Sequence, residues 1–376
     1  MKQKLRHFFQ TETVLCISAV LALISCFLVP PDSGYLAYID THTLVLLFCL
    51  MTVMAGFQQA GLFSKVSSFL LKNTGSQKSL ALVLVLLCFC SSMIITNDVA
   101  LITFVPLGIL AMKMAGMEPQ VCAIVTLMTI AANLGSMLTP IGNPQNLYLY
   151  SCAGLSLGEF LAITAPYTAI SALLLLIALP FCCGTHSSSL RIEMAQSSLQ
   201  TKPVILYSLL FVLALGAVAG IVSVWIVFAV VVVAVLAVDR TILKKVDYSL
   251  LATFASFFIF IGNMGRLDVF YNFIAGIVSG NEQLTAVLSS QIISNVPAAL
   301  LLSGFTSEWR ELIVGTNLGG LGTLIASMAS LISYKQICLH YPEKKSGYLI
   351  CFTLWNVGFL AVQLIFSFVI LPLFGV

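Results

Sequence analysis

Charged side chains are scarce in this chain of 376 residues. Only 8% are Asp, Glu, Lys or Arg, whereas soluble domains carry about 25%. Apolar residue types make up 60%, and a cytosolic enzyme, a nucleic-acid-binding protein or a disordered scaffold cannot keep so much apolar surface out of water. These three classes are excluded, so no nucleic-acid partner is expected. The net charge of +3 does not by itself indicate another binding partner.

Signals for bound metals are also lacking. The eleven Cys are scattered along the chain, and no pair has the spacing of a zinc site or of a thioredoxin-like motif. We interpret them as small apolar packing residues, and no cofactor is expected.

Long apolar runs are abundant instead. The mean hydropathy is +1.06, and a helix needs about 20 apolar residues to cross the bilayer. The sequence therefore predicts an all-α integral membrane protein surrounded by lipid. The runs cover residues 14–30, 41–57, 80–112, 119–138, 159–183, 203–222, 224–238, 248–265, 311–337 and 348–374.

Two polar interruptions do not fit a simple count of spans. Between Lys78 and Lys113 lie 34 residues, interrupted at residues 95–98, and between Glu282 and Glu308 lie 25, interrupted at residues 294–297. Two crossings need about 40 residues. The second segment therefore crosses once, or enters the membrane and returns to the same face.

The positions of Lys and Arg favour a segment that enters the membrane and returns to the same face. If both segments return to the face they left and the N-terminus is cytoplasmic, only Arg266 and Arg310 of the 17 basic residues lie outside. Basic residues accumulate on the cytoplasmic side of membrane proteins. We therefore expect two re-entrant hairpins, at about 79–113 and 283–306, each preceded by an amphipathic helix that lies in the membrane interface.

An internal repeat runs through the chain. Residues 132–143 align without a gap on residues 316–327, with identities that include Asn133 and Asn317, and Asn97 at the first hairpin tip corresponds to Asn295 at the second. Repeats of opposite orientation are typical of secondary transporters, whose sites form at the midplane where discontinuous helices meet. We expect a first inverted repeat over residues 1–183, a cytoplasmic linker over 184–202 and a second inverted repeat over 203–376.

Each half also contains a helix that is expected to be broken. Pro140 and Pro144 interrupt the helix at about 119–156, and four glycines interrupt the helix at about 311–337. Proline removes a backbone donor and glycine adds backbone freedom. A broken helix exposes carbonyls on one side of the gap, which suit a cation, and N–H groups on the other, which suit an anion.

The candidate site consists of polar residues at the two tips and the two breaks. The alternative for each is that it only packs helices or satisfies local backbone. Asp98 is the one acid expected deep in the membrane, which suggests an ion ligand or a proton carrier. We predict that substrate is bound by Asn97, Thr139, Gly142, Asn143, Ser294, Asn295, Thr323 and Ser327, and a coupling ion by Thr96, Asn97, Asp98, Asn133, Asn295 and Asn317.

These motifs resemble the ion transporter superfamily that includes divalent anion/sodium symporters, citrate-transporter-like permeases and arsenite efflux permeases. The resemblance covers the whole chain and is most specific at Ile95-Thr96-Asn97-Asp98, Thr139-Pro140-Ile141-Gly142-Asn143-Pro144, Ser294-Asn295-Val296-Pro297 and Gly315-Thr316-Asn317-Leu318-Gly319-Gly320. It implies a homodimer with a fixed scaffold and a moving transport domain. The hairpin tips of the dicarboxylate symporters read Ser-Asn-Thr and bind sodium and substrate; both tips here keep the Asn and lack the final Thr, and in this they look closer to the arsenite-permease branch.

We therefore expect a secondary transporter that moves a small anion, a carboxylate or an inorganic oxyanion, by alternating access with Na⁺ or H⁺ as coupling ion. Its expected place is a bacterial inner (plasma) membrane. Efflux of arsenite or a similar neutral metalloid hydroxide is the alternative, with Asp98 carrying the coupling proton. A channel needs a polar stripe along several spans, and an intramembrane hydrolase needs a paired acid, a Ser with His, or a zinc motif; both are less favoured, and no enzymatic activity is expected.

Overall fold

The computed structural model describes residues 12–72, 74–183 and 199–373, and within these ranges every regular element is a helix. Most of the linker predicted at 184–202 lies outside the described residues. The first half contains α2 (Thr13–Leu28), α3 (Tyr35–Tyr38), α4 (Thr41–Gln59), α5 (Leu62–Lys72), α6 (Gln77–Ile95), α7 (Asn97–Met114), η1 (Glu118–Gln120), α8 (Val121–Ser136), α9 (Pro144–Ala153) and α10 (Leu157–Cys182). The second contains α11 (Thr201–Val218), α12 (Val224–Val238), η2 (Arg240–Lys245), α13 (Tyr248–Met264), α14 (Asp268–Val278), α15 (Glu282–Ile293), α16 (Asn295–Ser303), α17 (Trp309–Leu318), α18 (Met328–His340), η3 (Pro342–Lys344), α19 (Lys345–Ile365), the π-helical turn η4 (Phe366–Ile370) and α20 (Leu371–Leu373).

The helices have the length and composition of membrane spans. Among the described residues seven are long and apolar enough to cross a bilayer, or eight if α13 and α14, bent by 107° at their junction, count as one span. The protein is therefore an all-α integral membrane protein, as the sequence predicts. The inverted orientation of the two halves stays a prediction.

The two halves begin their long helices in the same way. Asp40 accepts a hydrogen bond from the Thr43 N–H at 3.0 Å at the start of α4, and Asp247 accepts one from the Leu250 N–H at 2.9 Å at the start of α13. Both carboxylates satisfy an N–H group that has no partner within its helix.

Glycines allow each hairpin to pack closely on the broken helix of its own half. A Cβ atom added to Gly135 in α8 would lie 2.2 Å from the Phe89 carbonyl oxygen in α6, and one added to Gly319 after α17 would lie 2.5 Å from the Ser290 hydroxyl in α15. Small residues permit this close approach, which is typical of helix packing in membranes. The close contacts fix the hairpin tips next to the helix breaks.

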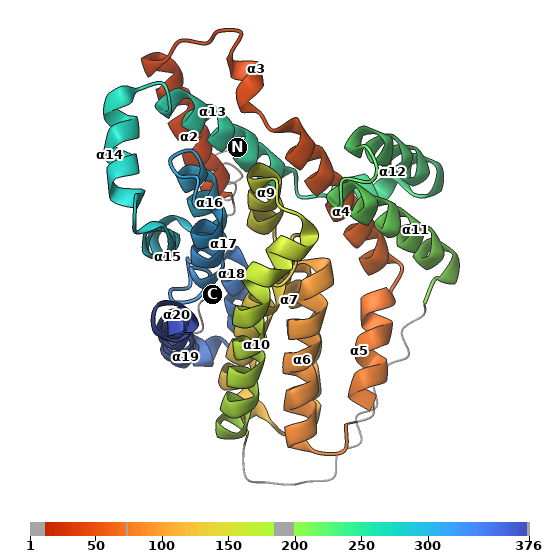
Figure 1. Cartoon of the computed structure of the whole chain (residues 1–376). Coiled ribbons are helices and arrows are strands. Elements are labelled where there is room, and N and C mark those ends of the chain that lie inside the picture. The colour runs from red at the N-terminus through yellow and green to blue at the C-terminus, as the bar shows by residue number, and fades with distance from the viewer. Residues whose placement is uncertain (1–11, 73, 184–198, 374–376) are drawn as a thin grey trace.

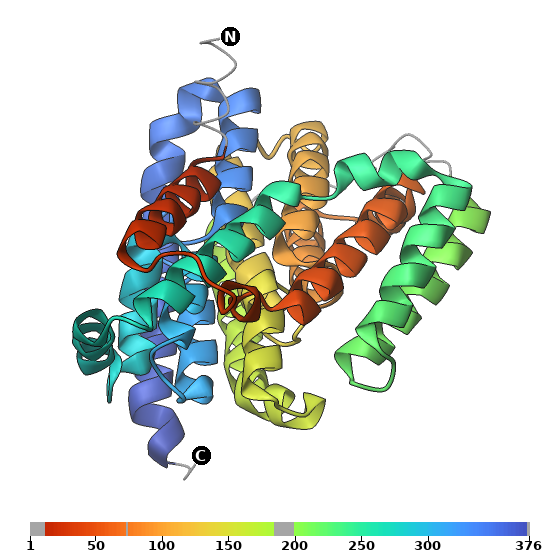
Figure 2. The ribbon, with the colours of Figure 1, turned by 90° about the horizontal axis from the view of Figure 1, so that it is seen from above.

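The hairpins and broken helices occupy the middle of the molecule. Figures 1 and 2 show α11 and α12 at one edge and α14 at the opposite edge, with α6 to α9 and α15 to α18 between them. In Figure 1 the first hairpin, α6 and α7, lies in the lower centre of the view, and the second, α15 and α16, lies above and to the left of it. This arrangement brings both tips to the central region in which the site is found.

Candidate functional site

Both hairpins turn at a residue with an unusual backbone conformation. Thr96 has φ 70° and ψ 148°, and Ser294 has φ 75° and ψ 154°. They are the only residues other than glycine with positive φ in the described part of the chain. Such a conformation costs about 1–3 kcal/mol in a residue with a side chain and is concentrated at functional sites. Its occurrence at matching positions of the two halves indicates that the tips have a shared role.

Each tip is tied to the helix break of its own half. The Asn97 N–H donates to the Gly142 carbonyl at 3.0 Å, and the Asn295 N–H donates to the Ala326 carbonyl at 2.9 Å. Gly142 and Ala326 occupy equivalent positions in the aligned repeat. The hairpin and the broken helix of each half therefore form one hydrogen-bonded unit.

Side-chain amides satisfy the carbonyls at both breaks. The Asn146 Nδ2 donates to the carbonyls of Ser136, Met137 and Thr139 at 3.2–3.3 Å. In the second half the Gln291 Nε2 donates to the carbonyls of Gly319 and Leu321 at 3.0 and 2.9 Å. The expectation of free carbonyls at the gaps is therefore wrong for these five groups.

The reason is that a broken helix buried in protein must satisfy its backbone groups. Gln291 also accepts from the Thr323 N–H at 2.9 Å, on the other side of the second gap. The carbonyl ends of the breaks thus have partners, and the residues that line the site described next lie mostly at helix N-termini.

Asparagines connect the two halves at their centre. Asn143 donates to the Asn317 Oδ1 at 3.1 Å, and Ser327 donates to the Asn133 Oδ1 at 3.2 Å. The two contacts are equivalent under the repeat, because Asn143 aligns with Ser327 and Asn133 with Asn317. Asn133 also accepts from the Asn97 Nδ2 at 3.1 Å, so the first tip joins the same network.

A small cavity of about 20 Å³ lies between the tips and the breaks, with room for one water-sized guest. Eight of its nine lining residues are the cap or the first two residues of four helices, α7, α9, α16 and α18. The ninth is Leu250, from α13. The lining consists of Asn97, Asp98, Pro144, Gln145, Leu250, Asn295, Val296, Ser327 and Met328.

The convergence of four helix N-termini gives the cavity a positive electrostatic character. Each N-terminus carries about half a positive charge from its aligned peptide dipoles, although the N–H groups of Asn97 and Asn295 already donate to Gly142 and Ala326. Asp98 is the one ionisable residue in the lining, and no Lys or Arg belongs to it. The arrangement therefore suits a small anion, with Asp98 as an acid of variable charge beside it.

The structure gives the predicted site residues four different places. Asn97, Asp98, Asn295 and Ser327 line the cavity, and Asn133, Asn143 and Asn317 lie behind it in the network. Thr96 and Ser294 supply the turns of the tips. The hydroxyls of Thr139 and Thr323 donate to the carbonyls of Met93 and Gln291, so they join each break to its hairpin, and Gly142 contributes its carbonyl.

Sequence reasoning missed two polar residues. Gln145 is 1% exposed, lines the cavity, and its Oε1 has no hydrogen-bond partner among the described residues. Gln291 holds the second break. The position of Gln145 directly after the Asn143-Pro144 break is a signal for it, whereas the role of Gln291 depends on packing between elements distant in sequence.

Comparisons with known proteins agree with the membrane architecture. The profile of the citrate transporter family matches residues 10–307. The chain is 32% identical to the inner membrane protein YbiR of Escherichia coli over 80% of each chain. It is 33% identical to the uncharacterized transporter MJ0456 of Methanocaldococcus jannaschii over 79% of this chain and 81% of that one. A shorter match, 32% identical, covers 39% of this chain and 29% of the silicon efflux transporter LSI3 of Oryza sativa.

Proposed function

The chain belongs to the citrate transporter family, and on this premise we propose that it is a secondary active transporter for a small anion, a carboxylate or an inorganic oxyanion. Transport follows alternating access and is coupled to Na⁺ or H⁺. The protein functions as a homodimer in a bacterial inner (plasma) membrane, with its N-terminus in the cytoplasm.

The observation that carries this proposal is the convergence of α7, α9, α16 and α18 on one cavity. Backbone N–H groups and helix dipoles bind anions without a basic side chain. The side-chain amides of Asn97 and Asn295 lie at the same place and add N–H donors. The anion is therefore held mainly by backbone dipoles, and the amides of the tips fix its orientation.

Asp98 is the group that couples transport to an ion. Its carboxylate lies beside the predicted anion and within the positive field of the helix N-termini. A carboxylate and an anion repel each other unless a proton or a sodium ion neutralises one of them. Binding of the coupling ion to Asp98 therefore favours binding of the anion, which is the requirement for coupled transport.

A closed form of the transporter accounts for the small size of the cavity. A space of about 20 Å³ cannot hold a carboxylate substrate. Leu250 belongs to α13, while the other eight lining residues belong to the hairpins and broken helices. Movement of these elements as one body relative to α13 opens the site.

A second function is favoured by one relative. LSI3 is named a silicon efflux transporter, and a cavity that offers both amide donors and the acidic Asp98 suits a neutral hydroxide as well. Under this second hypothesis the protein exports a neutral metalloid hydroxide such as arsenite, and Asp98 carries the coupling proton.

Gln145→Glu separates the two functions. It places a carboxylate among the four N-termini, where it is itself stabilised but excludes an anion. The purified protein is screened by thermal shift against oxyanions, carboxylates, arsenite and silicic acid, with and without sodium, because a ligand selective for the folded state raises the melting temperature.

We expect an anion to stabilise the wild type and the control Gln58→Glu, which changes an exposed residue of α4, but not Gln145→Glu. An anion that stabilises Gln145→Glu as strongly as the wild type would contradict the anion site. A shift by arsenite or silicic acid alone, retained in Gln145→Glu, would support the second function.

A further inference from the structure

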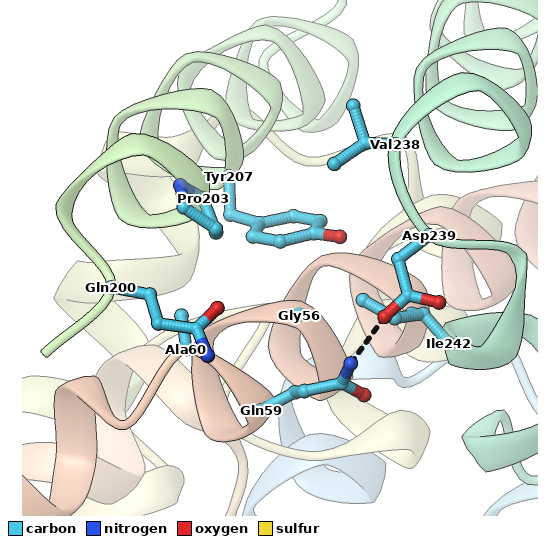
Figure 3. A pocket seen from close by; sticks show the side chains of 9 residues that line it. All are labelled: Gly56, Gln59, Ala60, Gln200, Pro203, Tyr207, Val238, Asp239 and Ile242. Carbon is cyan, nitrogen blue, oxygen red and sulfur yellow. Dashed lines mark hydrogen bonds between the residues drawn. The ribbon is translucent and has the colours of Figure 1, made fainter. Parts of the chain in front are cut away.

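A second and larger pocket lies outside the candidate transport site. It has a volume of about 200 Å³ and is formed where α4 ends, α11 begins and α12 passes into η2 (Figure 3). None of its residues belongs to the lining of the central cavity. It is lined by Gly56, Gln59, Ala60, Gln200, Pro203, Tyr207, Val238, Asp239 and Ile242.

A buried polar atom without a partner faces this pocket. Tyr207 is 1% exposed, yet its hydroxyl has no hydrogen-bond partner within the described ranges. The Gln59 Oε1 is buried and unpartnered there as well, while its Nε2 donates to the Asp239 carboxylate. Figure 3 shows the tyrosine hydroxyl pointing toward the side of the pocket on which Asp239 lies. Buried polar atoms usually have partners, so the Tyr207 hydroxyl indicates a ligand.

The position of the tyrosine ring is fixed by the backbone of α4. A Cβ atom added to Gly56 would lie 2.3 Å from the ring of Tyr207. Glycine at this position therefore allows the ring to pack flat against the helix. The pocket is a built feature of the contact between α4 and α11 and does not depend on a mobile side chain.

Asp239 lines the pocket, and basic residues are next to its lining residues in the sequence. Asp239 accepts hydrogen bonds from the N–H and hydroxyl of Thr241 at 2.9 and 2.6 Å, and these bonds lower the pKa of its carboxyl, which is therefore ionised at neutral pH. The exposed bases Arg240, Lys244 and Lys245 follow directly in η2, and Lys202 lies beside Pro203 at the start of α11.

These charges match a zwitterion that carries an ammonium group and a phosphate. A carboxylate and the tyrosine hydroxyl oxygen inside the pocket favour a cation that donates N–H bonds. Basic side chains that neighbour the lining residues in the sequence favour a phosphate. The pocket also lies at the ends of three apolar helices, the level at which lipid headgroups are found.

We propose that this pocket binds a phosphoethanolamine group, with the primary ammonium at Asp239 and Tyr207 and the phosphate at the neighbouring basic side chains, and that phosphatidylethanolamine of the surrounding bilayer supplies it. The lipid joins α4, α11 and α12 at one edge of the molecule and stabilises that part of the protein. The proposal is independent of the transported substrate.

The test compares melting temperatures in nanodiscs of phosphatidylcholine alone and of phosphatidylcholine mixed with phosphatidylethanolamine. The variants are Asp239→Asn, which removes the charge, and Tyr207→Phe, which removes only the hydroxyl. The matched control is Asp268→Asn, because Asp268 is an exposed acid at the start of α14, away from the pocket. Soluble O-phosphoethanolamine and phosphocholine are added in detergent as a second arm.

We expect phosphatidylethanolamine to raise the melting temperature of the wild type and of Asp268→Asn by a few degrees, and to raise that of Asp239→Asn and Tyr207→Phe by less than half as much. A shift with soluble phosphoethanolamine alone that Asp239→Asn loses would support the same chemistry with a soluble source. Equal shifts in all variants, an equal effect of phosphocholine, which has no N–H group to donate, or no shift in either arm would overturn the proposal.

Discussion

Asn146 is the residue whose removal tests most directly how the first helix break is stabilised. Its side chain is fully buried and donates to three carbonyls at the end of α8. Its Oδ1 accepts from the Asn317 Nδ2 at 2.6 Å, which joins the break to the second half. Asn146→Ala removes all four contacts and leaves buried polar groups without partners.

The loss can be estimated from the number of contacts. Hydrogen bonds in a membrane protein contribute about 0.6 kcal/mol each on average, so the four contacts give a lower limit of about 2 kcal/mol. Each buried group left without a partner costs about 1–3 kcal/mol, which places the upper limit several kcal/mol higher. Since about 1 kcal/mol shifts the melting temperature by about 2–4 °C in proteins of 150–250 residues and by less in longer chains, we expect a fall of a few degrees.

The assay is thermal unfolding of the purified protein in detergent, together with hydrogen exchange at the end of α8. Gln58→Ala is the control, because Gln58 is exposed on α4 and surface substitutions usually change stability by less than about 0.5 kcal/mol. We expect faster exchange near Met137 only in Asn146→Ala. A melting temperature within one degree of the wild type, with unchanged exchange, would refute the assigned role.

Three further predictions concern other parts of the molecule. Asp98→Asn should fold normally and abolish the dependence of transport on pH or sodium in proteoliposomes; an unchanged dependence removes Asp98 from coupling. Gly319→Ala should destabilise the protein by about 1–3 kcal/mol, because its Cβ would lie 2.5 Å from the Ser290 hydroxyl, whereas Gly347→Ala, which meets nothing within 4 Å, should not; equal melting temperatures would contradict the close packing. The Arg266 side chain lowers the pKa of the exposed Asp32 by hydrogen bonding at 2.7 Å, so the pair stabilises the fold above the unfolded pKa near 4 and this contribution is lost as the pH falls through the lowered folded value. Melting curves from pH 5 to 3 should show a small acid-sensitive component that Asp32→Asn lacks; the same component in both proteins would rule the pair out as its source.

The sequence predicts the helix breaks well because local chemistry determines them. Pro144 follows Asn143, whose side chain accepts from the Asn146 N–H at 2.9 Å and caps α9. Proline at the first position of a helix and Asn at its cap are both local preferences. The tips are likewise marked by short polar motifs within long apolar runs.

The contacts between elements were not predictable in the same way. Gln291 reaches the carbonyl of Gly319, which lies 28 positions further along the chain, and nothing in the local sequence specifies that pairing. The same holds for the unpartnered Tyr207 hydroxyl, which depends on the packing of α4 against α11. Residues that act through tertiary contacts need the structure, because tertiary packing and not local preference selects their partners.

The central claim is that two hairpins enter the membrane from opposite faces and meet at one cavity. It is tested by labelling single cysteines at positions 78, 113, 281 and 308 of a cysteine-free variant with a membrane-impermeant thiol reagent, from each side of sealed vesicles. Lys78, Lys113, Asn281 and Glu308 are all exposed and flank the two hairpins. The account predicts that 78 and 113 react from the cytoplasmic side and that 281 and 308 react from the opposite side. Either pair divided between the two faces would contradict it.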